Sequence, residues 1–223
     1  MSEPLHGSRP EPGPLVREED LLGPVDAVAP LLLGCWVVSD RPEGRVAVRL
    51  TEVEAYSGEG HDPASHAHRG PTPRAKIMFG PPGRLYVYFS YGVHWCANVV
   101  VGPPGRGSAV LLRAGEVVMG EELARSRRVA ARSARDLARG PARLTQALAI
   151  GPDDRGAHLL SPDSPVRLHR GPIPAAVSAG PRVGISQATD RPWRFWDSDA
   201  PSVSVFRPGG KPRRRTAEQD GLP

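Results

Sequence analysis

Hydrophobic and polar positions alternate along residues 46–54, which makes this stretch the most regular part of the chain. Val46, Val48 and Leu50 come at every second residue, and Glu52 and Glu54 continue the same spacing. Because successive side chains of a strand point to opposite faces, the pattern predicts a β-strand with all of these side chains on one face. Such a strand presents two carboxylates close together.

The same reasoning predicts further strands downstream. Residues 85–89 are aromatic and β-branched and are closely followed by Gly92. Residues 93–101 and 109–113 are apolar runs separated by a glycine-containing turn at residues 102–107. Aromatic and β-branched residues favour strands, and glycine marks the turns between them. We therefore expect neighbouring strands in this region.

Helices are predicted in two places. Residues 121–137 are good helix formers with many arginines, and residues 143–150 form a shorter run with Pro141 near its first turn. Beyond Gly151 the chain is broken into short segments by prolines, and no internal repeat is visible. The order of elements fits an α+β fold with a strand-rich core and few helices.

Composition narrows this picture. The chain has 223 residues, with 25 glycines, 26 prolines and a hydrophobic fraction of only 39%, so much of it should be turns and irregular loops. The net charge is +5, and only Lys76 and Lys211 among the 29 basic residues are lysines. Arginine pairs well with phosphates, so a polyanionic partner is one explanation. A GC-rich coding sequence is the other, and composition does not separate them.

The two ends differ from the middle. Residues 1–20 are polar and rich in Pro and Gly, which predicts a flexible arm, and the arginine-rich residues 207–223 predict a disordered basic tail. Residues 21–206 between them are expected to form one domain.

Neither the cysteines nor the apolar runs point to a secreted or membrane protein. Cys35 and Cys96 form no CxxC pair, so neither a disulfide framework nor a cysteine zinc site is expected, and a reducing compartment is favoured. The start of the chain lacks a signal-peptide pattern, and the longest apolar run, near residues 31–38, is too short to span a bilayer. We expect an intracellular protein without a membrane partner.

The paired glutamates are the first candidates for chemistry. Two nearby carboxylates raise one another's proton affinity, which can poise one of them as a general base. The alternative is an ordinary exposed strand that carries two acids. All four tyrosines follow closely, between Tyr56 and Tyr91. Tyrosine rings offer stacking surfaces for a nucleobase, so the neighbourhood favours chemistry on a base.

The tyrosines also have a structural interpretation. Tyr86 and Tyr88 share one face of their predicted strand, and they would form a stripe of core residues if that face were buried. Tyr91 sits at the strand's end beside Gly92. An exposed aromatic side chain at a turn is a candidate wedge that fills the gap left when a base leaves a duplex. The core interpretation suits Tyr86 better than Tyr91.

A histidine cluster allows a third interpretation. His61, His66 and His68, with Asp62 beside them, have residue types that bind metal ions. However, they lie in a loop with Pro63, and no His-Glu-x-x-His helix accompanies them. A histidine that lines a pocket is favoured over a metal site.

Several ordered motifs resemble one family. The motifs are Glu-Val-Glu-Ala-Tyr at 52–56, Asp-Pro-Ala-Ser-His-Ala-His-Arg-Gly at 62–70, Thr-Pro-Arg at 72–74, Met-Phe-Gly at 78–80, Leu-Tyr-Val-Tyr-Phe-Ser-Tyr-Gly at 85–92, Val-Leu-Leu-Arg-Ala at 110–114, Gly-Pro-Ala-Arg-Leu at 140–144, Gln-Ala-Leu at 146–148, Arg-Val-Gly-Ile at 182–185 and Trp-Arg-Phe at 193–195. Together they resemble the alkyladenine (3-methyladenine) DNA glycosylase family. The resemblance covers roughly residues 31–206 and implies a single domain with a curved, mainly antiparallel sheet and peripheral helices.

The resemblance implies a monofunctional enzyme in which water displaces a damaged base. It assigns Glu54 as the general base and Arg113 as a residue that helps to hold the water or the nearby backbone. The base would lie between Tyr56 and Tyr88. The remaining implied roles are a pocket wall at His66, with His68 as the alternative, a screen for exocyclic groups at Asn98, a wedge at Tyr91 and a DNA contact at Arg74.

The implied partner is double-stranded DNA with damaged purines: 3-methyladenine, 7-methylguanine, and hypoxanthine or ethenoadenine. No metal and no organic cofactor is implied, and a monomer that works in the cytoplasm, at the nucleoid of a bacterium, is expected. The competing hypotheses are a non-catalytic binder of distorted or damaged duplexes and a metal hydrolase built on the histidine loop. Release of free base from methylated DNA in the presence of chelator would separate the three.

Overall fold

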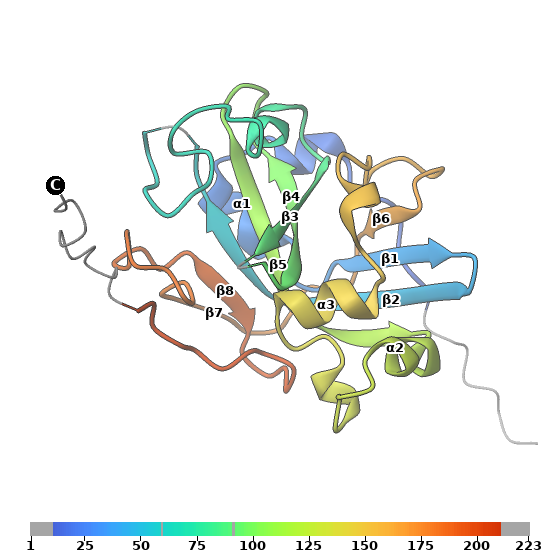
Figure 1. The fold of residues 1–223 in the computed structure, drawn as a ribbon. Coiled ribbons are helices and arrows are strands. Elements are labelled where there is room, and N and C mark those ends of the chain that lie inside the picture. Colours follow the sequence, from blue (N-terminus) through green and yellow to red (C-terminus); the bar gives the residue numbers. More distant parts are fainter. Residues whose placement is uncertain (1–10, 59, 91, 211–223) are drawn as a thin grey trace, which may run out of the picture.

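The computed structural model describes residues 11–58, 60–90 and 92–210. Its core is one curled antiparallel sheet with short helices around it (Figure 1). The strands are β1 (Trp36–Arg41), β2 (Gly44–Tyr56), β3 (Leu85–Ser90), β4 (His94–Val101), β5 (Ser108–Met119), β6 (Val166–His169), β7 (Val177–Gly180) and β8 (Arg194–Asp197). The α-helices are α1 (Val25–Leu31), α2 (Glu121–Arg127) and α3 (Pro141–Ala147). The prediction of an α+β domain with a curved, mainly antiparallel sheet is confirmed.

The long strand β2 organises the sheet. The order of the strands is β3-β4-β5-β2-β1-β6, and β8 also pairs with β2 and carries β7 on its other side. On one edge β2 pairs with β5 over most of its length, and on the other it pairs first with β1 and then with β8. The sheet therefore branches at β2, where β1 and β8 pair with successive halves of the same edge. The second half of β2, which carries the glutamates, is hydrogen-bonded to β5 on one edge and to β8 on the other.

A break in the pairing of β2 moves its glutamates out of the core. Val46, Val48 and Leu50, at even-numbered positions, lie in the main hydrophobic cluster. Beyond them it is Val53, at an odd-numbered position, that faces this cluster. The register with β5 shifts between Leu50 and Glu52 and again before Val53. An extra residue in one strand exchanges the two faces. The prediction that all five alternating side chains share one face is therefore wrong: the valines and Leu50 face the core, whereas the glutamates do not.

The face of the sheet opposite the core carries a row of chemically useful residues. Cross-strand partners point to the same side of a sheet. Glu54 is opposite Leu111, Leu111 is opposite Asn98, and Asn98 is opposite Tyr86. Strand pairing thus places residues from β2, β5, β4 and β3 in one line, although they are far apart in sequence.

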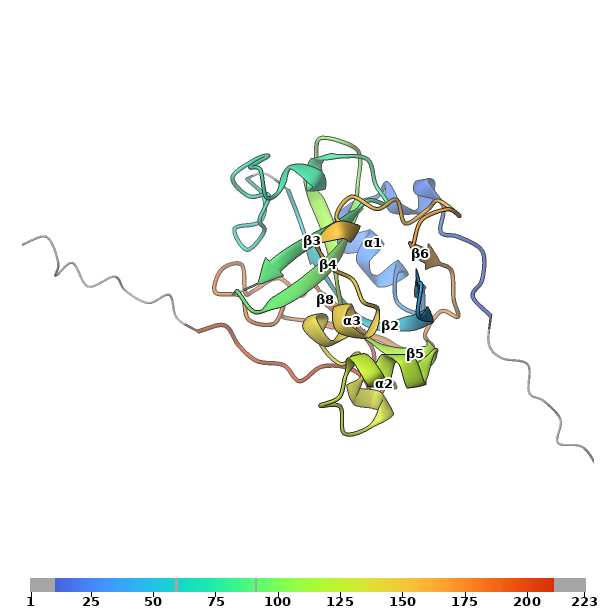
Figure 2. The same cartoon turned by 45° about the vertical axis from the view of Figure 1, so that its right-hand side comes forward.

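The helices cover the core face. Buried side chains of α1, α2 and α3 join one cluster with those of β2 to β5, among them Val28, Ala124 and Leu144. Seen from two directions, α3 lies beside β4 and β5 and α1 lies behind the sheet (Figure 2). Pro141 is the first residue of α3, as expected from its fixed φ angle and missing N–H.

The helix predicted at residues 121–137 is too long. The α-helix ends at Arg127, and only a short 3₁₀ turn, Ala134–Asp136, follows. Beyond the helix the side chain of Arg128 forms tertiary hydrogen bonds: its Nε donates to the carbonyl of Leu137 and its Nη1 to Oε1 of Gln146. Intrinsic helix propensity is a weak preference that such contacts override. The second predicted helix is present but spans Pro141–Ala147 rather than residues 143–150.

The ends of the chain differ from expectation in part. We expected a flexible arm over residues 1–20, but residues 11–20 lie against the domain: Leu15 forms a β-bridge with His169, and Val16 is buried. Of the expected basic tail, residues 207–210 are irregular. Residues 1–10 and 211–223 lie outside the described residues.

Cys35 and Cys96 are both buried and free. Among the residues that the structure describes, no helix is long and apolar enough to cross a membrane.

Candidate active site

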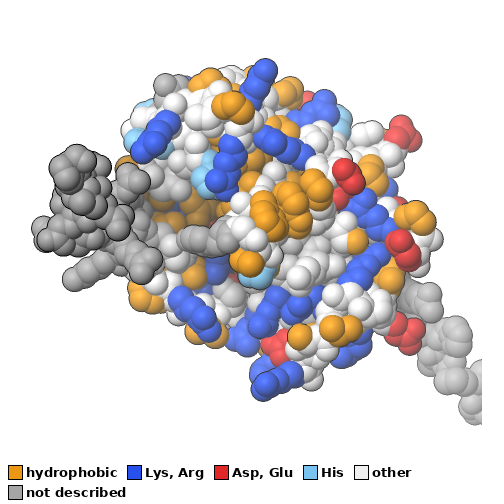
Figure 3. Space-filling view, viewed as in Figure 1, with side chains coloured by type: hydrophobic (Ala, Val, Ile, Leu, Met, Phe, Trp, Pro, Cys, Tyr) orange, Lys and Arg blue, Asp and Glu red, His pale blue; other side chains and the backbone are white. Residues whose placement is uncertain are grey.

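A cavity of about 590 Å³ opens on the face of the sheet opposite the core. In the space-filling view this face is hollowed, with hydrophobic side chains inside and Lys and Arg side chains above and below (Figure 3). The loop between β2 and β3 forms one wall and residues 183–187 form the other. The sequence-predicted residues that line it are Glu54, Tyr56, His66, Arg74, Tyr88, Asn98 and Arg113. The predicted wedge, Tyr91, lies outside the described residues.

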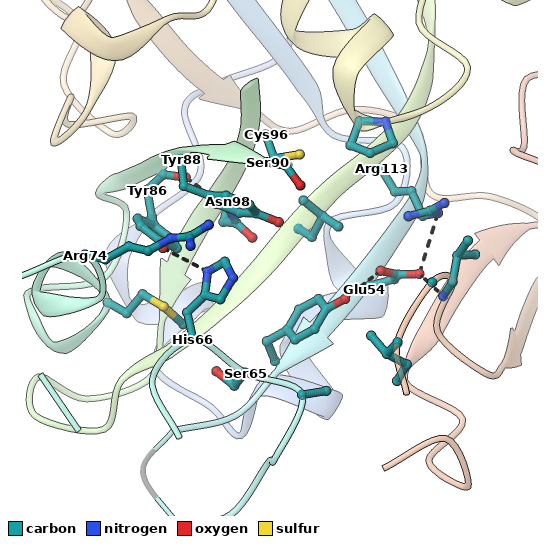
Figure 4. A pocket seen from close by; sticks show the side chains of 18 of the residues that line it. Glu54, Ser65, His66, Arg74, Tyr86, Tyr88, Ser90, Cys96, Asn98 and Arg113 are labelled. Carbon is teal, nitrogen blue, oxygen red and sulfur yellow. Dashed lines mark hydrogen bonds and ion pairs between the residues drawn. The ribbon is translucent and has the colours of Figure 1, made fainter. Parts of the chain in front are cut away.

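Glu54 lies at one end of the cavity with its carboxylate fully buried. Its Oε1 accepts a hydrogen bond of 2.7 Å from the peptide N–H of Val183, and its Oε2 accepts one of 2.9 Å from the Tyr56 hydroxyl. Nε of Arg113 lies 3.5 Å from Oε1. Figure 4 shows Glu54 and Arg113 on one side of the space and the cluster of Tyr86, Tyr88 and His66 on the other.

The surroundings of Glu54 act on its pKa in opposite directions. Burial is the largest influence and raises the pKa of Glu54 above its ordinary value. Arg113, the Val183 N–H and the Tyr56 hydroxyl each lower it, and Glu52 raises it further. Burial also raises the pKa of Tyr56 well above its ordinary value, so this hydroxyl stays protonated and donates a hydrogen bond to Glu54. A carboxylate with raised proton affinity beside a cavity is suited to take a proton from water.

Glu52, the other member of the pair, is fully engaged by the protein. It accepts hydrogen bonds from Nε of Arg194 at 2.6 Å and from the backbone N–H and the hydroxyl of Ser204 at 2.7 and 3.0 Å. Nε of Arg113 lies 3.0 Å from its Oε1. Glu52 does not line the cavity. The two glutamates are therefore not equivalent, and Glu52 serves to hold Arg113 and the segment around Ser204.

The opposite wall is aromatic. The rings of Tyr86 and Tyr88 are stacked with centroids 5.4 Å apart, and His66 meets Tyr88 edge-on at 4.6 Å. Nδ1 of His66 shares a hydrogen bond of 3.0 Å with the Tyr86 hydroxyl. Withdrawal of the imidazole from bulk water, together with the charge of Arg74, lowers the pKa of His66 to about 4. The ring is therefore neutral at pH 7.

Of the two histidines left open by the sequence, His66 lines the cavity and His68 does not. Tyr86, which fitted a core position, is indeed buried, yet its ring contributes to the same wall. Asn98 lies between the two sides of the cavity and donates from Nδ2 to the carbonyl of Tyr86 at 3.0 Å. The guanidinium of Arg74 lies 5.0 Å from the Tyr88 ring centroid at the exposed edge of the wall.

Sequence reasoning missed one buried pair beside the site. Asp62, considered only as a metal ligand, binds Arg182 through both carboxylate oxygens at 2.6 and 2.9 Å. Arg182 is fully buried, and its guanidinium lies 4.6 Å from the ring centroid of Tyr56. Among the described residues, no group of three or more His, Cys, Asp or Glu side chains is arranged to hold a metal ion. In the sequence, Arg182 stood out only as part of the family motif at residues 182–185. No sequence pattern indicated that it pairs with Asp62.

A second hollow, basic in character, adjoins the cavity. The two share Arg113, Pro141 and Val183 among their lining residues. The cationic side chains that line the second hollow are Arg113, Arg132, Arg139, Arg143 and Arg207, with His94 beside them, and Asp136 is the only acid there among the described residues. An excess of arginine beside a cavity is suited to bind a phosphate backbone.

Among the described residues, the cavity combines aromatic rings with the buried carboxylate of Glu54, and the arginine-lined hollow adjoins it. Such a site suits the class of proteins that act on nucleobases of a nucleic acid. A family model described as methylpurine-DNA glycosylase matches residues 19–201. Proteins named "Putative 3-methyladenine DNA glycosylase" are similar along nearly their whole length. The one from Nocardia farcinica is 52% identical over 86% of this chain and 92% of its own. Those from Streptomyces avermitilis and Frankia casuarinae are 50% and 54% identical, covering 93% and 85% of this chain and 98% and 92% of their own.

The chain therefore belongs to the methylpurine-DNA glycosylase family. It is a DNA glycosylase, a hydrolase that cleaves N-glycosyl bonds in the repair of damaged DNA. The resemblance noted in the sequence is confirmed.

Proposed function

We propose that the protein excises alkylated purines, such as 3-methyladenine and 7-methylguanine, from duplex DNA. The damaged nucleotide turns out of the duplex into the cavity, and a water molecule activated by Glu54 attacks the sugar carbon. Hypoxanthine and ethenoadenine are further candidate substrates. The protein acts as a monomer in the cytoplasm, at the nucleoid. One observation carries the proposal: among the described residues that line the cavity, Glu54 alone supplies a buried carboxylate, and the opposite wall is aromatic.

The carboxylate of Glu54 has the properties that this reaction requires. Its oxygens are fixed by Val183 and Tyr56, and its proton affinity is raised by burial. A positioned general base contributes about 10²–10⁴-fold in rate. The ionised carboxylate also stabilises positive charge that develops on the sugar as the bond to the base lengthens.

The cavity suits a cationic base. Alkylation at N3 or N7 gives a purine a positive charge, and electron-rich rings attract a cation by roughly 0.5–2 kcal/mol. Tyr56 and Tyr88 are the rings that we propose hold the base. His66 is neutral at pH 7, because its pKa is about 4, so it adds no repulsion. Damage also lowers the cost of unstacking a base, which favours entry of the lesion over that of normal purines.

Asn98 is placed to test the shape of the base. Its side chain is buried and held by the bond from Nδ2 to the Tyr86 carbonyl. A fixed polar group deep in a pocket discriminates strongly between ligands that satisfy it and ligands that clash with it. We propose that Asn98 screens purines by their exocyclic groups.

The arginine-lined hollow extends the site along the DNA. We propose that one strand follows the hollow beside α3 and that Arg74 contacts the backbone on the other side of the cavity. Tyr91, whose position the structure does not describe, would fill the space left in the duplex. Affinity should then fall steeply with salt, because each neutralised phosphate releases counterions.

Replacing the proposed base tests this assignment. Glu54→Gln should still bind a duplex with an abasic-site analogue but should release methylated purines about 10²–10⁴-fold more slowly. The substrate is methylated duplex DNA in chelator, and the released bases are identified by chromatography. Glu116→Gln, on a partly exposed residue that lines neither hollow, is the matched control. Wild-type rates in Glu54→Gln would remove this residue from the role, whereas equal affinity for damaged and intact DNA without base release would favour a non-catalytic binder.

A further inference from the structure

The buried pair of Asp62 and Arg182 joins the two walls of the cavity. Asp62 belongs to the loop after β2 that carries His66, and Arg182 precedes the segment of residues 183–187 that forms the other wall. Both side chains are fully buried in their ion pair. Asp62 also accepts the N–H groups of Ser57 and Ala64, so its carboxylate fixes the loop as well as the arginine.

Arg182 reaches the catalytic end of the cavity from behind. Its Nη1 donates to the carbonyl of Ala55 at 2.9 Å, between Glu54 and Tyr56, and its guanidinium lies under the Tyr56 ring. The next residue, Val183, gives its peptide N–H to Glu54. The side chain of Arg182 therefore contacts the Tyr56 ring, and its main chain leads directly into the peptide that binds Glu54.

We propose that Asp62 and Arg182 are positioning residues of the glycosylase, which fix the Tyr56 ring and the Val183 N–H against Glu54. This inference rests on the proposed role of Glu54. A buried ion pair is weak evidence for stability, since desolvation offsets much of its Coulomb attraction. Its bidentate geometry fixes position instead. Neither residue needs to touch DNA, and both act through the groups that hold the carboxylate.

The pH dependence of the reaction gives a direct readout. The titratable and charged groups that face Glu54 are Glu52, Tyr56, Cys96, Arg113 and Arg182. The Val183 N–H lowers the pKa of Glu54, so its loss raises that pKa. Because the general base must be ionised, the acidic limb of the rate profile then moves to higher pH. A purely structural pair would leave the limb in place in Arg182→Lys, which keeps the positive charge that faces Glu54.

The test uses a variant that leaves no unpaired buried charge, Asp62→Asn with Arg182→Met. Single-turnover excision should fall roughly 10–100-fold, the scale expected for a displacement of about 1 Å in an active site. The acidic limb of the pH–rate profile of this variant should move to higher pH. In protein labelled with ¹⁵N-valine, the Val183 amide proton, assigned through Val183→Ile, should move upfield because it loses its carboxylate acceptor. Should the double variant not fold, Arg182→Lys, which keeps the charge and loses the fork, carries the same three measurements.

A matched control is available elsewhere in the chain. Arg41 and Asp154 form an ion pair in which Nη2 of the arginine lies 2.8 Å from both carboxylate oxygens, and Asp154 also accepts a hydrogen bond from the N–H of Gly151. Neither residue lines the cavity or the arginine-lined hollow. Arg41→Met with Asp154→Asn should keep the wild-type rate, pH limb and Val183 signal.

A folded Asp62→Asn, Arg182→Met variant with a wild-type limb and Val183 signal overturns the inference. If the wild-type protein releases no base, the proposed function is wrong. The positioning inference is still tested in that case, because the Val183 amide signal is measured without DNA.

Discussion

The hydroxyl of Tyr56 donates to Oε2 of Glu54 at 2.9 Å, although the two residues are only two positions apart on one strand. Residues i and i+2 of a strand point to the same face, so this neighbourhood follows directly from the sequence. Burial keeps the hydroxyl protonated by raising the pKa of Tyr56. The tyrosine therefore has two functions to offer, a ring for stacking and a donor that stabilises the ionised carboxylate.

Tyr56→Phe separates these two functions. The ring remains for stacking, but Glu54 loses a hydrogen bond that lowers its pKa. A hydrogen bond to a charged group stabilises the ionised form, so loss of the Tyr56 hydroxyl should raise the pKa of Glu54 further. The acidic limb of the single-turnover rate should move to higher pH while the rate on the alkaline plateau changes little. An unchanged limb would show that the hydroxyl does not act on the reacting carboxylate.

Glu54→Gln should change stability in a pH-dependent way. The folded-state pKa of Glu54 is raised above its ordinary value of 4.5, so the ionised form destabilises the fold. Below about pH 4 both states are protonated and the cost vanishes, whereas it is fully present once pH exceeds the folded pKa. The melting temperature of Glu54→Gln minus that of wild type should therefore be positive at pH 8 and fall towards zero at acid pH. Scanning calorimetry across this range checks the sign, and a difference that stays constant with pH contradicts it.

Part of the site was predictable from the strands. Strand periodicity and the neighbouring tyrosines drew attention to Glu54, Tyr56 and Tyr88, which line the cavity. Asn98 and Arg113 also line it, but they were predicted from the family resemblance alone, because periodicity within one strand does not say which strands pair. What periodicity could not supply was the shift after Leu50, because nothing in the alternation of residues 46–54 marks the extra residue.

The parts that escaped prediction depend on contacts between distant segments. Asp62 and Arg182 are 120 positions apart, and the single sequence gives no signal that pairs them. The difference between Glu52 and Glu54 arises from Arg194 and Ser204, which arrive from the far end of the chain. The helix proposed for residues 121–137 ends at Arg127, and the tertiary contact of the Arg128 side chain with Leu137 is likewise not visible in the local sequence.

The arginine-lined hollow should contribute to DNA binding through its exposed cations. Arg132→Ala and Arg143→Ala remove exposed cations that line it. If each contacts one phosphate, each should reduce the slope of log K against log salt by about 0.9 and weaken binding without changing the single-turnover rate at saturation. Arg125→Ala is the control, because this exposed arginine on α2 pairs with Glu121 and lines neither hollow. Titrations of a fluorescent duplex at several salt concentrations give the slopes, and slopes equal to that of Arg125→Ala would place the DNA elsewhere.

Gly120, between β5 and α2, provides a test of the fold itself. Its φ angle is +74°, and a Cβ added there would lie 2.1 Å from the carbonyl oxygen of Arg45. Gly120→Ala meets both a left-handed backbone, which costs a residue with Cβ roughly 1–2 kcal/mol, and a clash with backbone that cannot move aside cheaply. For a chain of this size, each kcal/mol lowers the melting temperature by about 2–4 °C, so a fall of at least several degrees is expected.

Gly151→Ala is the matched control for that variant. Gly151 has a φ angle of −140°, and an added Cβ there meets nothing within 4 Å. Its melting temperature should stay at or slightly above that of wild type, because alanine reduces the entropy of the unfolded chain. Calorimetry of both variants compares the positions directly. If Gly120→Ala and Gly151→Ala melted at the same temperature, the turn into α2 would have to adapt to the added Cβ. The close approach of Gly120 to the Arg45 carbonyl would then not constrain the fold.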